Sequence, residues 1–294
     1  MVEVIEGCLQ APTPLPPPAL TFLDAQARRY SRLKSHQDGL DLVMFWRQDD
    51  AGLYGRRFDM LVDRLARRPE IRRIAIFDPP YAAHRLWEGR DESPTTQMGE
   101  IQNAKLVRRW GLSDTDKVSH HVFLFDKFGN LPHGDYPDEA AFPEFVAEEL
   151  ERMGIDPGES VFWYYPVFDE LEALDERFQP RLRLVDVVDD QRAWPGRTTG
   201  RRDSMDRHYR TLLVAADIVL ANCDTVRDSL AECAPDIKVV PNGCDLDPVP
   251  ADPDNRRFAR FATLEGPILG LVGNLEPKTD AALLERLARE RPDC

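Results

Sequence analysis

Residues 41–77 decide the fold, and they read DLVMFWRQDDAGLYGRRFDMLVDRLARRPEIRRIAIF. Two runs in this stretch, 41–46 and 71–77, are largely apolar rather than alternating, which is typical of strands that a parallel sheet buries on both faces. Between them, apolar residues recur every three or four positions, as in an amphipathic helix: Phe58, Leu61, Val62 and Leu65. The stretch therefore predicts a strand, a helix and a second strand.

The same alternation continues along the chain. Five more apolar runs of strand length follow, at residues 118–125, 161–165, 182–188, 217–221 and 237–240. Stretches with helical spacing separate them, for example over 142–153 and 205–216. Seven strands that alternate with helices predict an α/β domain over residues 41–244, with a doubly wound, mostly parallel seven-stranded sheet of the Rossmann-like kind.

The two ends of the sequence differ from this pattern. Residues 1–40 form a Pro-rich N-terminal extension, with five prolines between positions 12 and 18, and we expect an extended tether there. Residues 245–264 are rich in Pro and Asp, which is typical of a linker. Over 265–294 we expect a strand at 268–272 and a helix at 279–290, the first strand-helix unit of a second α/β domain that is cut off.

The amino-acid composition excludes some kinds of binding partner and favours others. The chain carries 52 acidic against 38 basic residues, a formal net charge of −14, which argues against nucleic acid as the main partner. No apolar run approaches the roughly 18 residues of a membrane-spanning helix. Peripheral membrane contact through a local basic patch stays possible but is not indicated by the sequence. The N-terminus has no basic segment followed by an apolar core, so we expect a cytoplasmic protein. The five cysteines include no C-x-x-C spacing, which favours reduced thiols over a metal site.

Ligands of open α/β sheets bind beyond the carboxyl ends of the strands, so the loops that follow the strands are the first places to look. Gly55, Arg56 and Arg57 follow the first strand and lead into a helix. Free amides at a helix start, with arginines beside them, suit a hydroxyl-rich or anionic substrate. The alternative is that both arginines belong to the solvated face of that helix.

Two further strand ends carry candidate residues. Asp186, Asp189 and Asp190 crowd the end of the fifth strand, where carboxylates can orient sugar hydroxyls or take a proton. Alternatively, one of them caps the following loop and another pairs with an arginine. Tyr165 ends the aromatic run 163–165, which suits either a platform for a sugar ring or core packing.

A third candidate lies in the last unit. Gly273, Asn274 and Lys278 follow the expected strand at 268–272. A glycine at a strand end lets the backbone approach a phosphate, and a lysine entering the next helix supplies the counter-charge. His120 and His121 are adjacent on one strand and therefore point to opposite faces, which favours core or edge positions over a shared ligand.

Several of these segments together resemble the GT-B fold glycosyltransferases of group 1 (family 4-like), which use nucleotide sugars. The similarity spans about residues 40–294. The segments that carry it are GRRF (55–58), FWYYP (162–166), DVVDD (186–190), AADIVLANC (215–223), VVPNGCD (239–245) and LVGN (271–274) with Lys278.

The resemblance implies two facing α/β domains and transfer of a sugar from a nucleotide-diphosphate donor to a hydroxyl acceptor, with no metal and no further cofactor. It implies acceptor-side roles in the first domain and contacts to the donor diphosphate in the second. The corresponding residues are Asp189 and Asp190 for catalysis, Gly55, Arg56, Arg57 and Tyr165 for substrate binding, and Gly273, Asn274 and Lys278 for the donor.

Two departures from the family set the expectations for activity. Asn274 stands where the family often has arginine, and the E-x7-E region that binds the nucleotide sugar is missing. We therefore expect an incomplete donor site and no turnover by this chain alone. The alternative is a non-catalytic module that keeps the acceptor-domain fold to bind a glycan or a protein, and donor affinity separates the two. A GT-B epimerase is a weaker alternative, since its acidic and histidine groups have no clear place here.

Overall fold

A computed structural model describes residues 39–46, 50, 52–86, 96–129, 136–166, 170–194, 196–243, 266–271 and 279–293. The chain divides into two compact units, Met1–Gly243 and Cys244–Cys294, which are considered separately. Residues 1–38 of the expected Pro-rich extension and the whole of the expected linker, 245–264, lie outside the described residues.

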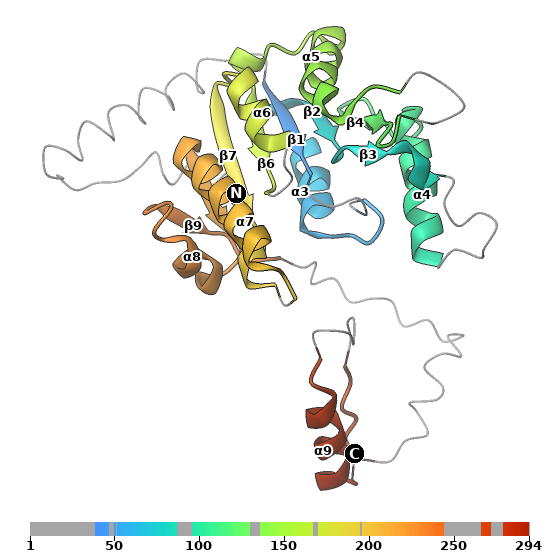
Figure 1. The fold of residues 1–294 in the computed structure, drawn as a ribbon, viewed down its shortest axis with the longest axis vertical. Coiled ribbons are helices and arrows are strands. Elements are labelled where there is room, and N and C mark those ends of the chain that lie inside the picture. Colours follow the sequence, from blue (N-terminus) through green and yellow to red (C-terminus); the bar gives the residue numbers. More distant parts are fainter. Residues whose placement is uncertain are drawn as a thin grey trace, which may run out of the picture. The chain divides into compact units, whose positions relative to one another are not determined.

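The first unit contains a seven-stranded sheet in which every neighbouring pair is parallel (Figure 1). Its strands are β1 (Leu40–Phe45), β2 (Ile71–Phe77), β4 (Val118–His121), β6 (Val161–Tyr164), β7 (Leu182–Val187), β8 (Ile218–Ala221) and β9 (Ile237–Val239). They lie in the order β4-β2-β1-β6-β7-β8-β9. Renumbered within the sheet, this is 3-2-1-4-5-6-7, which contains the Rossmann order. The predicted fold class is confirmed.

One predicted strand is divided in the structure. The run 118–125 becomes β4 and, after two residues, β5 (Leu124–Phe125), which pairs with β3 (Tyr81–Ala82) in a second, two-stranded parallel sheet. The cause lies on the neighbouring strand, where Asp78 is followed by Pro79 and Pro80. Proline has no N–H to donate to a sheet ladder, so pairing stops after the Asp78 N–H and resumes at the Tyr81 N–H.

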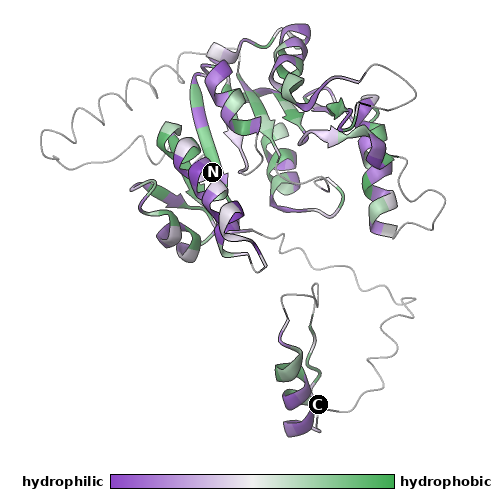
Figure 2. Ribbon diagram, viewed as in Figure 1, coloured by the Kyte–Doolittle hydropathy of each residue, from purple (hydrophilic) through white to green (hydrophobic). Residues whose placement is uncertain are grey.

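Helices cover both faces of the large sheet. They are α3 (Arg57–Ala66), α4 (Thr96–Arg109), α5 (Phe142–Met153), α6 (Glu170–Arg177), α7 (Thr199–Ala215) and α8 (Asp224–Leu230), with short 3-10 turns η1 (Ala83–Leu86), η2 (Glu139–Ala141), η3 (Pro157–Glu159) and η4 (Gln191–Ala193). Apolar colour concentrates on the strands and on the inward sides of these helices (Figure 2).

Strand β1 shows how the two faces are filled. Val43 and Phe45 pack in the cluster that α5, α6, α7 and α8 complete, while Leu42 and Met44 pack in the cluster that includes Phe58 of α3. This follows from the two-residue period of a strand, which sends successive side chains to opposite faces. Each fully buried side chain of this size stabilises the fold by about 1.5–3 kcal/mol relative to exposure.

The second unit contains α9 (Ala281–Glu290), which Asp280 caps by accepting the Leu283 N–H at 3.0 Å. This matches the helix expected at 279–290. The strand expected at 268–272 is not found: residues 266–271 are described and form no strand, and Val272 lies outside the described residues. A strand needs a hydrogen-bonded neighbour, and the described part of this unit offers none. Ile268, Leu269 and Leu271 are exposed as a result.

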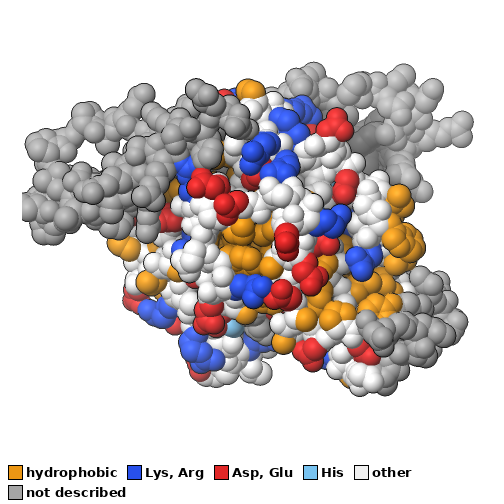
Figure 3. Space-filling model, turned by 90° about the horizontal axis from the view of Figure 1, so that it is seen from above, with side chains coloured by type: hydrophobic (Ala, Val, Ile, Leu, Met, Phe, Trp, Pro, Cys, Tyr) orange, Lys and Arg blue, Asp and Glu red, His pale blue; other side chains and the backbone are white. Residues whose placement is uncertain are grey.

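Surface charge is mixed rather than segregated. On the face seen from above, basic and acidic side chains alternate around a central group of apolar ones (Figure 3). The described side chains of this face form no continuous basic stripe, in agreement with the negative net charge. Within the described ranges, no helix has the length and apolarity that a bilayer crossing requires.

At the amino end of the sheet, Asp41 joins β1 to two arginines of β2. Its buried carboxylate accepts hydrogen bonds from Arg72 at 2.5 Å and from Arg73 at 2.7 Å, and Arg73 also donates to the Gly154 carbonyl at 3.1 Å. Burial alone would raise the pKa of Asp41, but the two arginines outweigh it and lower that pKa.

Asp41→Asn tests this ion pair. Both arginines remain partly solvated, so we expect the free energy of unfolding at pH 7 to fall by about 1–3 kcal/mol in urea titrations. Because the folded pKa is lowered, the contribution is present above the unfolded pKa of about 3.9 and lost as pH falls through the folded pKa. The control is Asp63→Asn, whose exposed pair with Arg67 is worth at most about 1 kcal/mol. Equal losses in the two variants would contradict the prediction.

Candidate functional site

The order of strands in the large sheet reverses between β1 and β6. From β1 the chain proceeds to β2 and β4 on one side, and it then returns to β6 on the other. The loops after β1 and β6 therefore diverge at their carboxyl ends, where open α/β sheets bind ligands. Gly55 and Arg56 end the connection from β1 to α3, and Arg57 is the first residue of that helix, so all three lie at this switch point.

Asp59, in the first turn of α3, fixes the chain at the N-terminal end of this helix. The Asp59 carboxylate accepts the Gly52 N–H at 2.6 Å and the Arg56 N–H at 2.7 Å. Burial raises the pKa of Asp59 in spite of these hydrogen bonds. The Arg56 side chain is exposed and pairs with Asp50 at 2.5 Å. Gly52 has φ +82°, a backbone conformation that L side chains rarely adopt, and a Cβ there would also require the end of the Arg108 side chain to shift.

Arg57 connects three distant segments. Its Nε donates to Asp186 at 3.2 Å and its Nη1 donates to Asn242 at 3.1 Å. The guanidinium thus joins the start of α3, the end of β7 and the loop after β9. Asp186 is fully buried, and burial raises its pKa although Arg57 acts in the opposite direction. Substrate binding by Arg57 stays a prediction, and these contacts give its guanidinium two partners within the protein.

Tyr165 lies beneath the same helix. Its ring stacks on Trp163 with centroids 5.9 Å apart and meets the edge of Phe58 at 4.5 Å, so the ring is part of the core. The Tyr165 hydroxyl is buried and has no hydrogen-bond partner in the described part of the chain. Burial raises the pKa of Tyr165 well above its usual value, which keeps the hydroxyl protonated.

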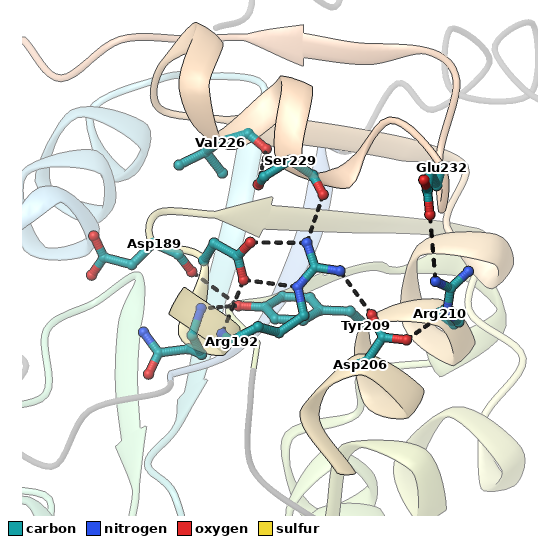
Figure 4. Close-up of polar contacts among 10 residues, drawn as sticks. Asp189, Arg192, Asp206, Tyr209, Arg210, Val226, Ser229 and Glu232 are labelled. Atoms are coloured by element: carbon teal, nitrogen blue, oxygen red, sulfur yellow. Dashed lines mark hydrogen bonds and ion pairs between the residues drawn. The ribbon is translucent and has the colours of Figure 1, made fainter. Parts of the chain in front are cut away.

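Asp189 and Asp190, predicted as catalytic, have different surroundings (Figure 4). The Asp190 carboxylate accepts from Arg192 Nε and Nη2, both at 2.9 Å, and from the Arg192 N–H at 3.0 Å, which caps η4. Burial would raise the pKa of Asp190, and the Arg192 hydrogen bonds lower it. The backbone carbonyl of Asp189 accepts a hydrogen bond from the Tyr209 hydroxyl at 2.9 Å. The exposed Asp189 carboxylate points away from this cluster.

Arg192 fastens three elements around this strand end. Besides Asp190 it donates to Asp206 of α7 at 2.7 Å and to the Ser229 carbonyl of α8 at 2.6 Å (Figure 4). The contacts of Asp190 and Asp186 agree with the alternative in which one strand-end carboxylate caps a loop and another pairs with an arginine. The structure thus brings Arg57 and Asp186 together, whereas Arg56 pairs with Asp50 rather than with Asp189 or Asp190.

A buried charge cluster at the end of β2 was not predicted. Lys105 Nζ lies 2.8 Å from Asp78 Oδ2, and Arg108 Nη1 lies 3.1 Å from both carboxylate oxygens. Burial would raise the pKa of Asp78, but the two cations lower it. Burial also lowers the pKa of neighbouring His120 to about 4. The signal in the sequence is an acidic residue at a strand end, followed by two cations three positions apart.

The donor-side candidates Gly273, Asn274 and Lys278 lie outside the described residues. Among the residues that are described, no group of His, Cys, Asp and Glu is arranged to hold a metal ion.

No family model and no curated protein matches this sequence.

Arg57→Met tests the connection at the switch point. It leaves Asp186 buried without its cation, so we expect a loss of about 3–5 kcal/mol in the free energy of unfolding at pH 7. Because the folded pKa of Asp186 is raised, the ionised carboxylate opposes folding, and stability should fall as pH rises from about 4. Urea titrations between pH 4 and 7 measure this.

The double variant Arg57→Met/Asp186→Asn removes both charges and should recover part of the stability and lose the added pH dependence. Arg67→Met, at the exposed end of the same helix, is the matched control. This account of Arg57 is wrong if Arg57→Met is as stable as wild type. It is also wrong if the double variant is no more stable than Arg57→Met.

Proposed function

We propose that this chain provides the acceptor-side domain of a nucleotide-sugar glycosyltransferase, with the hydroxyl acceptor bound at the switch point between β1 and β6. The observation that carries the proposal is the Arg57 guanidinium, which joins Asp186 and Asn242. These three residues belong to three of the segments on which the family resemblance rests. Their meeting at the ligand-binding edge of a Rossmann-type sheet supports a shared function.

The arrangement at the switch point suits a polyhydroxyl ligand. The exposed guanidinium of Arg56 offers several donors in one plane, and the first turn of α3 adds backbone N–H groups and a positive dipole end. Tyr165 supports this site from the core beneath α3, where its ring packs against Phe58. Sugars present both donors and acceptors, and Asp50 and Asp59 lie close enough to Arg56 to accept from sugar hydroxyls.

For proton transfer from the acceptor hydroxyl we assign Asp189 rather than Asp190. The Asp190 carboxylate holds Arg192 and caps η4, so its removal would disturb the fold. Asp189 lies one position earlier at the same strand end, and its carboxylate is exposed. The donor would be a nucleotide-diphosphate sugar, with Gly273, Asn274 and Lys278 as the proposed contacts to its phosphates.

Arg56→Ala tests the acceptor site. A charged hydrogen bond contributes about 1.5–3 kcal/mol, so the variant should bind glycans roughly 10–100-fold more weakly than wild type. The measurement is screening on a glycan array, followed by calorimetry with the best array ligand. Arg67→Ala is the matched control, because Arg67 is also exposed and paired with an aspartate at the opposite end of α3.

Calorimetry with uridine- and guanosine-diphosphate sugars separates a transferase from a binding module. Donor binding supports a transferase, whereas glycan binding without donor binding supports a module with the same fold. Glycan affinity that is equal in wild type, Arg56→Ala and Arg67→Ala would place the acceptor elsewhere and overturn the proposal.

A further inference from the structure

Ser119, His121 and Glu149 form a hydrogen-bonded chain away from the switch point. Ser119 and His121 lie two positions apart on β4, the edge strand, and so share one face of the sheet. Ser119 Oγ lies 2.9 Å from His121 Nε2, and His121 Nδ1 lies 2.8 Å from Glu149 Oε2 on α5. A hydroxyl within reach of an imidazole that a carboxylate orients is the arrangement of an activated nucleophile.

The imidazole of His121 is held on several sides. Phe77 of β2 stacks on it, with centroids 4.8 Å apart and planes 24° apart. Arg152, one turn further along α5, pairs with Glu149 and fixes that carboxylate. His121 lowers the pKa of Glu149 to about 2, so Glu149 is ionised and can only accept. In neutral His121 the proton therefore sits on Nδ1, and the Nε2 lone pair faces the Ser119 hydroxyl.

A hollow of about 230 Å³ lies beside the base of this trio and is lined by His121 and Glu149 together with Arg109, Phe145 and Arg152. Ser119 does not line this hollow, but its own side chain is partly exposed. Its only other described hydrogen-bond partner is the Met153 sulfur at 3.3 Å, a weak acceptor, so the hydroxyl proton is best placed toward the imidazole.

The chain also contains a looser version of the same trio. Ser204 and His208 lie on α7, with Ser204 Oγ 3.3 Å from His208 Nε2. His208 Nδ1 lies 3.0 Å from Oε1 of Glu172 on α6. The serine-histidine distance there exceeds the ~2.6–3.2 Å range of an active pair, whereas the distance at Ser119 falls within it. The second trio is therefore an internal control for the first.

We propose that Ser119 is a nucleophile activated by His121 and oriented through Glu149, and that it accepts the acyl group of a small ester. Ser119 Oγ forms a bond to the acyl carbon while its proton moves to His121 Nε2. The carbon–oxygen bond to the alcohol breaks, and the alcohol leaves with that proton. Water then attacks the acyl-serine by the same route, releases the carboxylic acid and restores the hydroxyl.

The test uses an alkyl fluorophosphonate probe, in which an activated serine oxygen attacks the phosphorus and displaces fluoride. The modified serines of the wild-type chain are then identified by peptide mapping with mass spectrometry. We expect modification of Ser119 at least tenfold faster than that of Ser204. His121→Gln should slow the modification of Ser119 about 100-fold, at the lower end of the range for general-base catalysis. Glu149→Gln should slow it as well, and Ser204→Ala and His208→Gln should leave it unchanged.

The wild-type map is decisive even where a variant fails to fold, and melting temperatures identify such variants. An unmodified Ser119, or one that reacts no faster than Ser204, overturns the proposal. If Ser119 is modified at the wild-type rate in folded His121→Gln, the proposal is also overturned, because His121 then does not activate the serine. Hydrolysis of p-nitrophenyl acetate that is lost in folded Ser119→Ala would extend the result from the probe to an ester.

Discussion

The structure depends on the complete burial of the central strand β1. Val43, Met44 and Phe45 have no solvent exposure, and their side chains alternate between two separate clusters. A strand with this composition has no face to offer to water, so a layer of helices is needed on each side of the sheet. In the described part of the chain, α5, α6, α7 and α8 pack on one face and α3 packs on the other, and the strand order creates the switch point at which α3 begins.

Among the described residues, the three buried aspartates lie at the two ends of the strands of this sheet. Asp41 lies at the amino edge, and Asp78 and Asp186 lie at the carboxyl edge, each with a cation from another element. Removing such a carboxylate from water costs several kcal/mol, and pairing repays this cost only with good geometry. The pairs therefore act mainly as constraints on which elements come together. At the carboxyl edge they fix the loops that surround the proposed ligand.

The sequence predicted the sheet well because continuous apolar runs are the signal of doubly covered strands. The runs 71–77 and 182–188 match β2 and β7 to within one residue. The prediction of one strand over 118–125 was wrong because the division of this run depends on Pro79 and Pro80, which follow the neighbouring strand. The residues of 118–125 themselves contain no signal for that division. The run 268–272 misled for a related reason, since apolar residues form a strand only where a partner is present.

Prediction of the site was less complete, because pairing partners are set by the fold rather than by spacing. The sequence placed Arg56 and Arg57 at a helix start and Asp186, Asp189 and Asp190 at a strand end, and both placements agree with the structure. It could not say that Arg57 would reach Asp186 or that Asp190 would hold Arg192. The cluster of Asp78, Lys105 and Arg108 was missed because its members are separated by loops of unpredictable course.

The hydrogen bonds of Arg57 also bear on the order of folding. They join residues 129 and 185 positions apart in the chain, so each closes a very long loop. Contacts of this kind repay their entropic cost only when much of the intervening chain is already ordered. The bond to Asn242 in addition requires β9, the last strand of the sheet to be synthesised. On a ribosome, the carboxyl edge is therefore completed at the end of the first unit's synthesis, after the hydrophobic layers have formed.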